Sequence, residues 1–145
     1  MIIGIGQDSA NIDRIGKLLK GKDGKMGDRF IKRCFTQKET DRAERLRGVN
    51  GHIAVYAKRF AAKEAASKAL GTGFAHGVFM KDIGVGNNEH GQPTLTFTNG
   101  ALERLNALTP KGHIAKAYIT LTDEPPLANA MVIIEALPET LSDIG

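Results

Sequence analysis

The chain has 145 residues, of which 41% are hydrophobic and 25% are charged, and its formal net charge is +4. This is typical of one globular domain, here residues 1–145, and it excludes a mainly disordered chain. No apolar run approaches the roughly 18 residues of a membrane span, and no basic leader precedes the first isoleucines. A single cysteine, Cys34, excludes an internal disulfide, so we expect a cytoplasmic protein with no membrane contact and Cys34 in the core.

The charge is distributed unevenly along the chain. Residues 9–35 hold eight basic and three acidic side chains, whereas residues 120–145 hold five acidic side chains and no Lys or Arg. The basic segment is either an ordinary solvated surface or a contact for an acidic protein, a phosphorylated ligand or nucleic acid. Nucleic acid has little further support, because the chain lacks Trp and contains no aromatic-rich RNA-binding motif.

The N-terminal part predicts a strand and then a helix. Three isoleucines make residues 1–5 a short buried strand that ends at Gly6, with Asp8 at its exit. Ser9 and Asn11 are candidate N-caps of an amphipathic helix that follows. The outer face of that helix is basic and carries Arg14, Lys17 and Lys20.

Two further helices are predicted before residue 71. The Gly- and Lys-rich residues 21–27 predict a loop. Thr36 and Glu39 form a capping-box pattern, which predicts a helix over residues 36–47. The alanine-rich residues 52–70 are the strongest helix of the chain, and glycines follow its end.

The C-terminal half is richer in predicted strands. Hydrophobic alternation and turn residues predict a strand over 78–85, a turn over 87–93, a strand over 94–98, a short helix over 102–108, and strands over 115–122 and 129–137, the last one central. Late strands joined by short turns indicate an α+β fold, in which an antiparallel sheet packs on a long helix and shorter helices.

The long helix carries polar groups where a packing stripe would be apolar. One face presents Phe60, Glu64, Ser67, Lys68 and Gly71. One interpretation is a surface ion pair between Glu64 and Lys68, worth a few tenths of a kcal/mol. The alternative is a binding site, because the surrounding alanines leave room and the glycine turn could offer N–H groups to phosphate oxygens.

Asp8 adds a second carboxylate at a strand end. Two carboxylates, with water and ligand phosphates at the remaining positions, are typical of a Mg²⁺ site. Together with the lysine and glycines, they indicate chemistry on a phosphate or pyrophosphate.

These motifs resemble the holo-(acyl-carrier-protein) synthase family, the bacterial 4′-phosphopantetheinyl transferases of fatty acid biosynthesis. Residues 3–8 and the longer, highly specific motif at residues 59–73 carry the resemblance, which covers nearly the whole chain. It implies the 4′-phosphopantetheinyl transferase fold. It also implies Mg²⁺-dependent transfer of 4′-phosphopantetheine from coenzyme A to a serine of apo-acyl carrier protein, with release of adenosine 3′,5′-bisphosphate.

The resemblance also implies roles for individual residues. It makes Asp8 and Glu64 the metal ligands. The chemistry of the transfer adds that Lys68, like the metal, would stabilise the developing charge, so that Asp8, Glu64 and Lys68 are the catalytic residues. It also requires a base to deprotonate serine, and our first choice is Glu64, either directly or through a metal-bound water. The coenzyme-binding positions are Arg59, Ser67, Lys68, Gly71, Thr72, Gly73 and, near the adenine, Pro93. The acidic carrier protein docks on Arg14, Lys17 and Lys20, and the family is usually a homotrimer with active sites shared between subunits.

One position departs from the family pattern. Asp123 stands where many members have histidine, and it is either a further metal-ligating or water-orienting group or an ordinary turn residue before Pro125. Two other functions remain open: a coenzyme A or nucleotide-binding module without transferase activity, and a basic nucleic-acid-binding domain.

Overall fold

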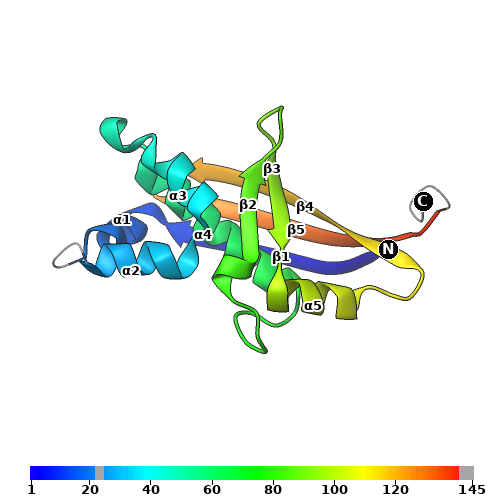
Figure 1. Cartoon of the computed structure of the whole chain (residues 1–145). Coiled ribbons are helices and arrows are strands. Elements are labelled where there is room, and N and C mark those ends of the chain that lie inside the picture. Colours follow the sequence, from blue (N-terminus) through cyan, green and yellow to red (C-terminus); the bar gives the residue numbers. More distant parts are fainter. Residues whose placement is uncertain (22–24, 141–145) are drawn as a thin grey trace.

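The computed structural model describes residues 1–21 and 25–140 (Figure 1). In chain order the elements are β1 (Ile2–Asn11), α1 (Ile12–Lys20), α2 (Lys25–Cys34), α3 (Gln37–Glu44), α4 (His52–Ala69), β2 (Ile83–Asn87), β3 (Pro93–Phe97), α5 (Asn99–Leu108), β4 (His113–Glu124) and β5 (Leu127–Pro138). Two short 3-10 turns, Arg47–Val49 and Met80–Asp82, precede α4 and β2.

The strands form two antiparallel sheets. The larger has the order β1-β5-β4, and the smaller is the β2–β3 hairpin, which crosses the direction of the long strands in Figure 1. The long helix α4 packs against β1 and β5. The predicted α+β class is therefore confirmed. The predictions that an antiparallel sheet packs on a long helix and that the last strand is central in the sheet are also confirmed.

Two glycines bring β1 into contact with α4. A Cβ atom at Gly4 would lie 2.2 Å from the carbonyl oxygen of Ala69, and one at Gly6 would lie 2.0 Å from that of Ala65. Successive side chains of a strand point to opposite faces, so the intervening Ile5 points away from α4 and is 63% exposed. The prediction of a short buried strand at residues 1–5 is thus wrong: β1 runs on to Asn11.

The sheet face opposite α4 stays open in the described part of the chain. Its positions on β1, β4 and β5 are exposed or half-buried, although many are apolar. The large exposed apolar side chains on this face are Ile5, Ile114, Tyr118, Leu127 and Met131.

A buried ion pair joins α3, α4 and β2. Lys63 Nζ lies 2.7 Å from Glu39 Oε1, and the two side chains have 0% and 1% exposure. Lys63 also donates to the carbonyl oxygens of Met80 and Ile83, and the second carboxylate oxygen of Glu39 accepts from the amide of Val85. Burial lowers the pKa of Lys63, while the Glu39 charge opposes that shift. The pair fixes where the β2–β3 hairpin begins.

The structure corrects several predicted boundaries. α2 begins at Lys25, so the loop predicted over residues 21–27 is too long; residues 22–24 lie outside the described chain. The strand predicted over 78–85 begins only at Ile83, because Met80–Asp82 form a 3-10 turn around the ammonium of Lys63. The capping box at Thr36 and the burial of Cys34 are confirmed.

Candidate active site

Asp8 and Lys68 join β1 to α4. Asp8 lies inside β1, opposite Ala130 of β5, rather than at the exit of a strand. The ammonium of Lys68 donates to Asp8 Oδ1 over 2.9 Å and to the carbonyl oxygen of Gln7 over 3.2 Å. The ionic partner of Lys68 is therefore on another element, whereas the surface-pair interpretation placed it with Glu64 on its own helix.

Glu64 lies one helical turn before Lys68 and faces the same place. Burial raises the pKa of the Glu64 carboxyl; a hydrogen bond with the Asp8 carboxyl and the negative charge of Asp8 raise it further, while Lys68 opposes the shift. The carboxyl groups of Asp8 and Glu64 thus lie next to each other, beside the ammonium group of Lys68. Such a pair can bind a divalent cation or hold a proton between its oxygens.

The donor set fits Mg²⁺. Mg²⁺ is usually held by one or two carboxylates together with water and substrate phosphates, and Asp8 and Glu64 supply two. Burial, together with the hydrogen bond and the charge of the neighbouring Asp8, raises the pKa of Glu64, and the ammonium of Lys68 opposes that shift. Within residues 1–21 and 25–140, no group of three or more His, Cys, Asp and Glu side chains could hold a metal by protein ligands alone.

The turn after α4 has the backbone conformation that its glycines allow. Gly71 and Gly73 have φ values of 79° and 59°, which side chains disfavour. The amides of Gly71, Thr72 and Gly73 donate to carbonyl oxygens of Ser67 and Lys68. These N–H groups are consequently engaged at the end of the helix, and the expectation that they are free for phosphate oxygens is not met in this conformation.

The side chains around this turn are also held in place. Ser67 is buried, and its hydroxyl donates to the carbonyl oxygen of Glu64 over 2.7 Å. Arg104 of α5 donates through Nε to the carbonyl oxygen of Leu70, and its guanidinium lies beside Gly71. The sequence analysis missed Arg104. A cation at a helix C-terminus is a common cap, but its source on a distant helix gives no sequence signal.

Arg59 and Pro93 lie together in a second group, next to the turn that joins β2 to β3. The buried guanidinium of Arg59 donates through Nη2 to Asn87 Oδ1 over 2.9 Å, and Asn87 pairs with Pro93 in the hairpin. Burial lowers the pKa of Arg59, and the charge of Arg42 adds to that shift. The residues expected to bind coenzyme thus fall into two groups, one beside Asp8 and one at the hairpin.

The basic face of α1 is fully presented to solvent. Arg14, Lys17 and Lys20 are exposed, and none takes part in a salt bridge among the described residues. The helix begins at the N-cap Asn11, whose side chain accepts from the amide of Arg14. Of the two caps proposed, Ser9 instead lies within β1 and donates to Asn129.

Asp123 has a partner of its own. It lies in β4, and its Oδ1 atom is 3.3 Å from the ammonium of Lys58 on α4. Asp123 is therefore neither a turn residue nor a member of the Asp8–Glu64 pair. Its negative charge offsets a cation of the long helix.

The comparisons with known proteins agree over nearly the whole chain. A family model described as the 4′-phosphopantetheinyl transferase superfamily matches residues 4–121. The chain is 53% identical to a holo-(acyl-carrier-protein) synthase of Granulibacter bethesdensis, over 100% of this chain and 97% of that one. It is 54% identical to the protein of the same name from Rhizobium meliloti, over 95% and 94%.

Solved structures show the same fold. The holo-(acyl-carrier-protein) synthase of Neisseria meningitidis matches with a TM-score of 0.77 and 32% identity, over 93% of this chain and 99% of that one. The enzyme of that name from Bacillus anthracis, solved in complex with CoA (3′,5′-ADP), matches with a TM-score of 0.71 and 33% identity, over 94% and 99%. No helix in the described residues has both the length and the apolar character needed to cross a membrane.

Proposed function

The chain belongs to the 4′-phosphopantetheinyl transferase superfamily, and from that premise we propose that it transfers 4′-phosphopantetheine from coenzyme A to a serine of apo-acyl carrier protein. The products are holo-acyl carrier protein and adenosine 3′,5′-bisphosphate. Residues 1–145 act as one transferase domain. The observation that carries the proposal is the pairing of Asp8 and Glu64 beside Lys68, in a chain that matches named synthases from end to end.

The site residues have distinct tasks in this reaction. Asp8 and Glu64 hold Mg²⁺, which, when bound, stabilises charge on the pyrophosphate. As the serine oxygen bonds to the β-phosphorus and the bond to the departing bisphosphate breaks, Lys68 stabilises the negative charge on the phosphoryl oxygens. Glu64 is our choice for the base that accepts the serine proton.

The two groups of coenzyme-binding residues suit the two ends of coenzyme A. Ser67, Lys68 and the turn at residues 71–73 lie at the pyrophosphate end, where the Lys68 ammonium supplies the contact because the N–H groups of the turn are engaged within the chain. Arg59 and Pro93 take the adenosine end. The exposed cations of α1 take the acidic carrier protein, so that the serine approaches the phosphorus in a fixed orientation.

A homotrimer with shared active sites is supported by the open sheet face. Apolar side chains from three strands lie on it, and contiguous exposed apolar patches mark interaction surfaces in soluble proteins. Size-exclusion chromatography with light scattering tests the assembly, which we expect to have three times the 15.6 kDa of one chain. We place the enzyme in the cytoplasm, with no membrane or nucleic-acid partner.

Mass spectrometry tests the activity directly. The protein, incubated with coenzyme A, Mg²⁺ and apo-acyl carrier protein, is expected to increase the mass of the carrier by one phosphopantetheine group. Binding of coenzyme A without any mass change, across several carriers, would instead favour a coenzyme-binding module. Salt-dependent DNA binding that coenzyme A leaves unchanged would favour a nucleic-acid-binding domain.

A further inference from the structure

Arg104 of α5 closes the C-terminal end of α4. Its Nε atom donates to the carbonyl oxygen of Leu70 over 2.8 Å, and its Nη2 atom would lie 3.3 Å from a Cβ atom at Gly71. Leu70 is the C-cap residue of α4, so its carbonyl oxygen is one of those that a helix leaves without a partner of its own. Arg104 thus contacts both residues at which the chain leaves α4 and enters the glycine turn.

The guanidinium group of Arg104 suits this contact. It takes part in no salt bridge among the described residues, so no carboxylate draws it away from the end of the helix. A cation also interacts favourably with the partial negative charge at a helix C-terminus. The planar group lets Nε donate to one carbonyl oxygen while Nη2 lies against the next residue, an arrangement that the single nitrogen of a lysine cannot reproduce in full.

α5 is itself fixed to the segment that joins α4 to β2. A Cβ atom at Gly100 would lie 1.8 Å from the carbonyl oxygen of Gly77, so the first turn of α5 is in close contact with that segment. The side-chain amide of Asn99 donates to the carboxylate of Asp82 over 3.1 Å. The joining segment is therefore held by α5 at its start, through Arg104, and again near its end.

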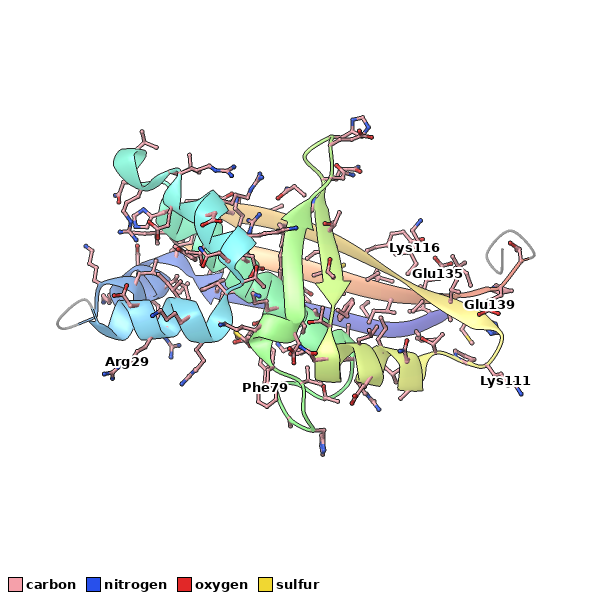
Figure 2. All side chains as sticks on the ribbon, in the orientation of Figure 1. Arg29, Phe79, Lys111, Lys116, Glu135 and Glu139 are labelled. Atoms are coloured by element: carbon pink, nitrogen blue, oxygen red, sulfur yellow. The ribbon has the colours of Figure 1, made fainter. Side chains whose placement is uncertain are left out.

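The first part of this segment is open to solvent. Residues 71–77 are exposed or half-buried, and Phe79, farther along, points away from the molecule in Figure 2. The amides of the three turn residues, 71–73, donate to carbonyl oxygens in the last turn of the same helix. Helix ends that rest on such local bonds fray. Arg104 ties this end to a second helix.

The ammonium of Lys68 is held independently of Arg104. It donates to Asp8 and to the carbonyl oxygen of Gln7, both in β1. Loss of the contact between Arg104 and Leu70 therefore changes the path of the turn more than the place of the ammonium.

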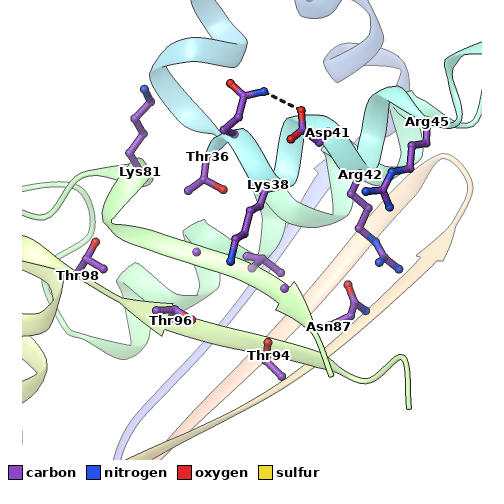
Figure 3. A pocket seen from close by; sticks show the side chains of 14 residues that line it. Thr36, Lys38, Asp41, Arg42, Arg45, Lys81, Asn87, Thr94, Thr96 and Thr98 are labelled. Carbon is purple, nitrogen blue, oxygen red and sulfur yellow. Dashed lines mark hydrogen bonds between the residues drawn. The ribbon is translucent and has the colours of Figure 1, made fainter. Parts of the chain in front are cut away.

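The adenosine end of the coenzyme site lies apart from Arg104. Asn87, which accepts from Arg59, lines the groove between α3 and the β2–β3 hairpin (Figure 3). Neither Arg104 nor Gly71 lines that groove. A change at Arg104 is therefore expected to act on the pyrophosphate end alone.

We propose that Arg104 is a positioning residue for coenzyme A: by holding the carbonyl oxygen of Leu70, it fixes the glycine turn against which the pyrophosphate and the pantetheine arm lie. This role rests on the proposed function, and in it Arg104 contacts the turn rather than the substrate. A turn that is fixed before the coenzyme binds does not have to be ordered by binding, so Arg104 contributes to the KM for coenzyme A rather than to the chemical step.

Transferase kinetics with the whole protein test this role. Arg104→Met is expected to raise the KM for coenzyme A about tenfold, as for the loss of one hydrogen bond from a charged group, with kcat and the KM for the carrier protein near the parent values. Arg104→Lys, which keeps one donor, should recover part of the parent KM. A parent KM for coenzyme A in Arg104→Met, or a fall confined to kcat, would overturn the proposal.

A destabilised variant elsewhere separates positioning from general stability. Val55→Ala truncates a buried side chain in the first half of α4 and is expected to lower Tm while leaving the KM for coenzyme A unchanged. Arg104→Met should raise that KM even where its Tm falls less. A KM that rises with the loss of Tm alike in both variants would leave Arg104 an ordinary helix cap and refute the positioning role.

Calorimetry with two ligands locates the effect. Coenzyme A carries the pyrophosphate and the pantetheine arm, whereas adenosine 3′,5′-bisphosphate lacks both. Arg104→Met should weaken binding of coenzyme A much more than binding of the bisphosphate, whereas Asn87→Ala should weaken both. Equal weakening of the two ligands by Arg104→Met would refute an action through the turn. If the parent binds coenzyme A but modifies no carrier protein, the proposed transferase fails, and the two affinities still decide the role of Arg104.

Discussion

Lys68 donates from the C-terminal half of α4 to the carboxylate of Asp8 in β1, over 2.9 Å and across 60 positions of sequence. In this arrangement the ammonium supplies the positive charge that the Asp8–Glu64 pair requires. When Mg²⁺ takes that role, we expect the ammonium to become available to phosphate oxygens.

Removal of this ammonium is expected to reduce catalysis more than binding. Lys68→Met should lower kcat by about 10²–10³-fold, the usual effect of deleting one group that stabilises charge in the transition state. Lys68→Arg should recover part of that loss, and Lys111→Met, at an exposed lysine on another surface, serves as the control. An unchanged kcat in Lys68→Met would contradict the assigned role.

The metal ligands are expected to be indispensable. Asp8→Asn and Glu64→Gln should each lower turnover by about 10³-fold or more, because a bound cation contributes several kcal/mol to stabilising transition-state charge. Circular dichroism should show an intact fold, and Glu103→Gln on exposed α5 provides a neutralising control. Full activity in either variant would remove that residue from the metal site.

The sequence predicted this site because its residues lie in dense local patterns. Glu64 and Lys68 share a helix face, and the helix itself follows from alanine content. The contact with Asp8 requires a close approach of β1 to α4, which the absence of side chains at Gly4 and Gly6 permits. No hydrophobic periodicity in the sequence indicates that approach. The Lys63–Glu39 pair was not predicted for a similar reason: charged residues are almost never fully buried unless paired, and the partner lies on another helix.

Ionisation of Glu64 is expected to destabilise the metal-free protein. The pKa of Glu64 is raised in the folded state above its unfolded value, so deprotonation costs stability. The cost is absent below the unfolded pKa and is fully present above the folded pKa. In EDTA, Glu64→Gln should therefore raise Tm at neutral pH, and this gain should shrink as the pH falls through the folded pKa. A constant difference across pH would be inconsistent with this coupling.

Charge reversal on α1 is expected to affect the protein substrate alone. Arg14→Glu with Lys17→Glu should raise KM for the carrier protein and weaken the increase of that KM with salt, while KM for coenzyme A stays constant. The control is Lys111→Glu on another part of the surface (Figure 2). An increase confined to KM for coenzyme A would remove α1 from the docking surface.

Breaking the buried ion pair is expected to be costly for stability. Lys63→Met leaves Glu39 buried without its cation, and the expected loss is about 3–5 kcal/mol of unfolding free energy in urea. Glu39→Gln with Lys63→Met should lose less than the sum of the single variants, because the charge left unpaired in each single variant is then absent. Additive losses would indicate that the two side chains act independently.

The absence of side chains at Gly4 and Gly6 has a consequence for engineering this enzyme. Substitution of either residue by alanine would reduce the freedom of the unfolded chain, and a design procedure that scores strand propensity would favour it. Either methyl group would also push β1 away from the carbonyl oxygens of α4, and with it the carboxylate of Asp8 from Glu64 and Lys68. Design by strand propensity alone therefore places a displaced β1 and a dismantled site in the product, so variants in β1 need to be screened for turnover.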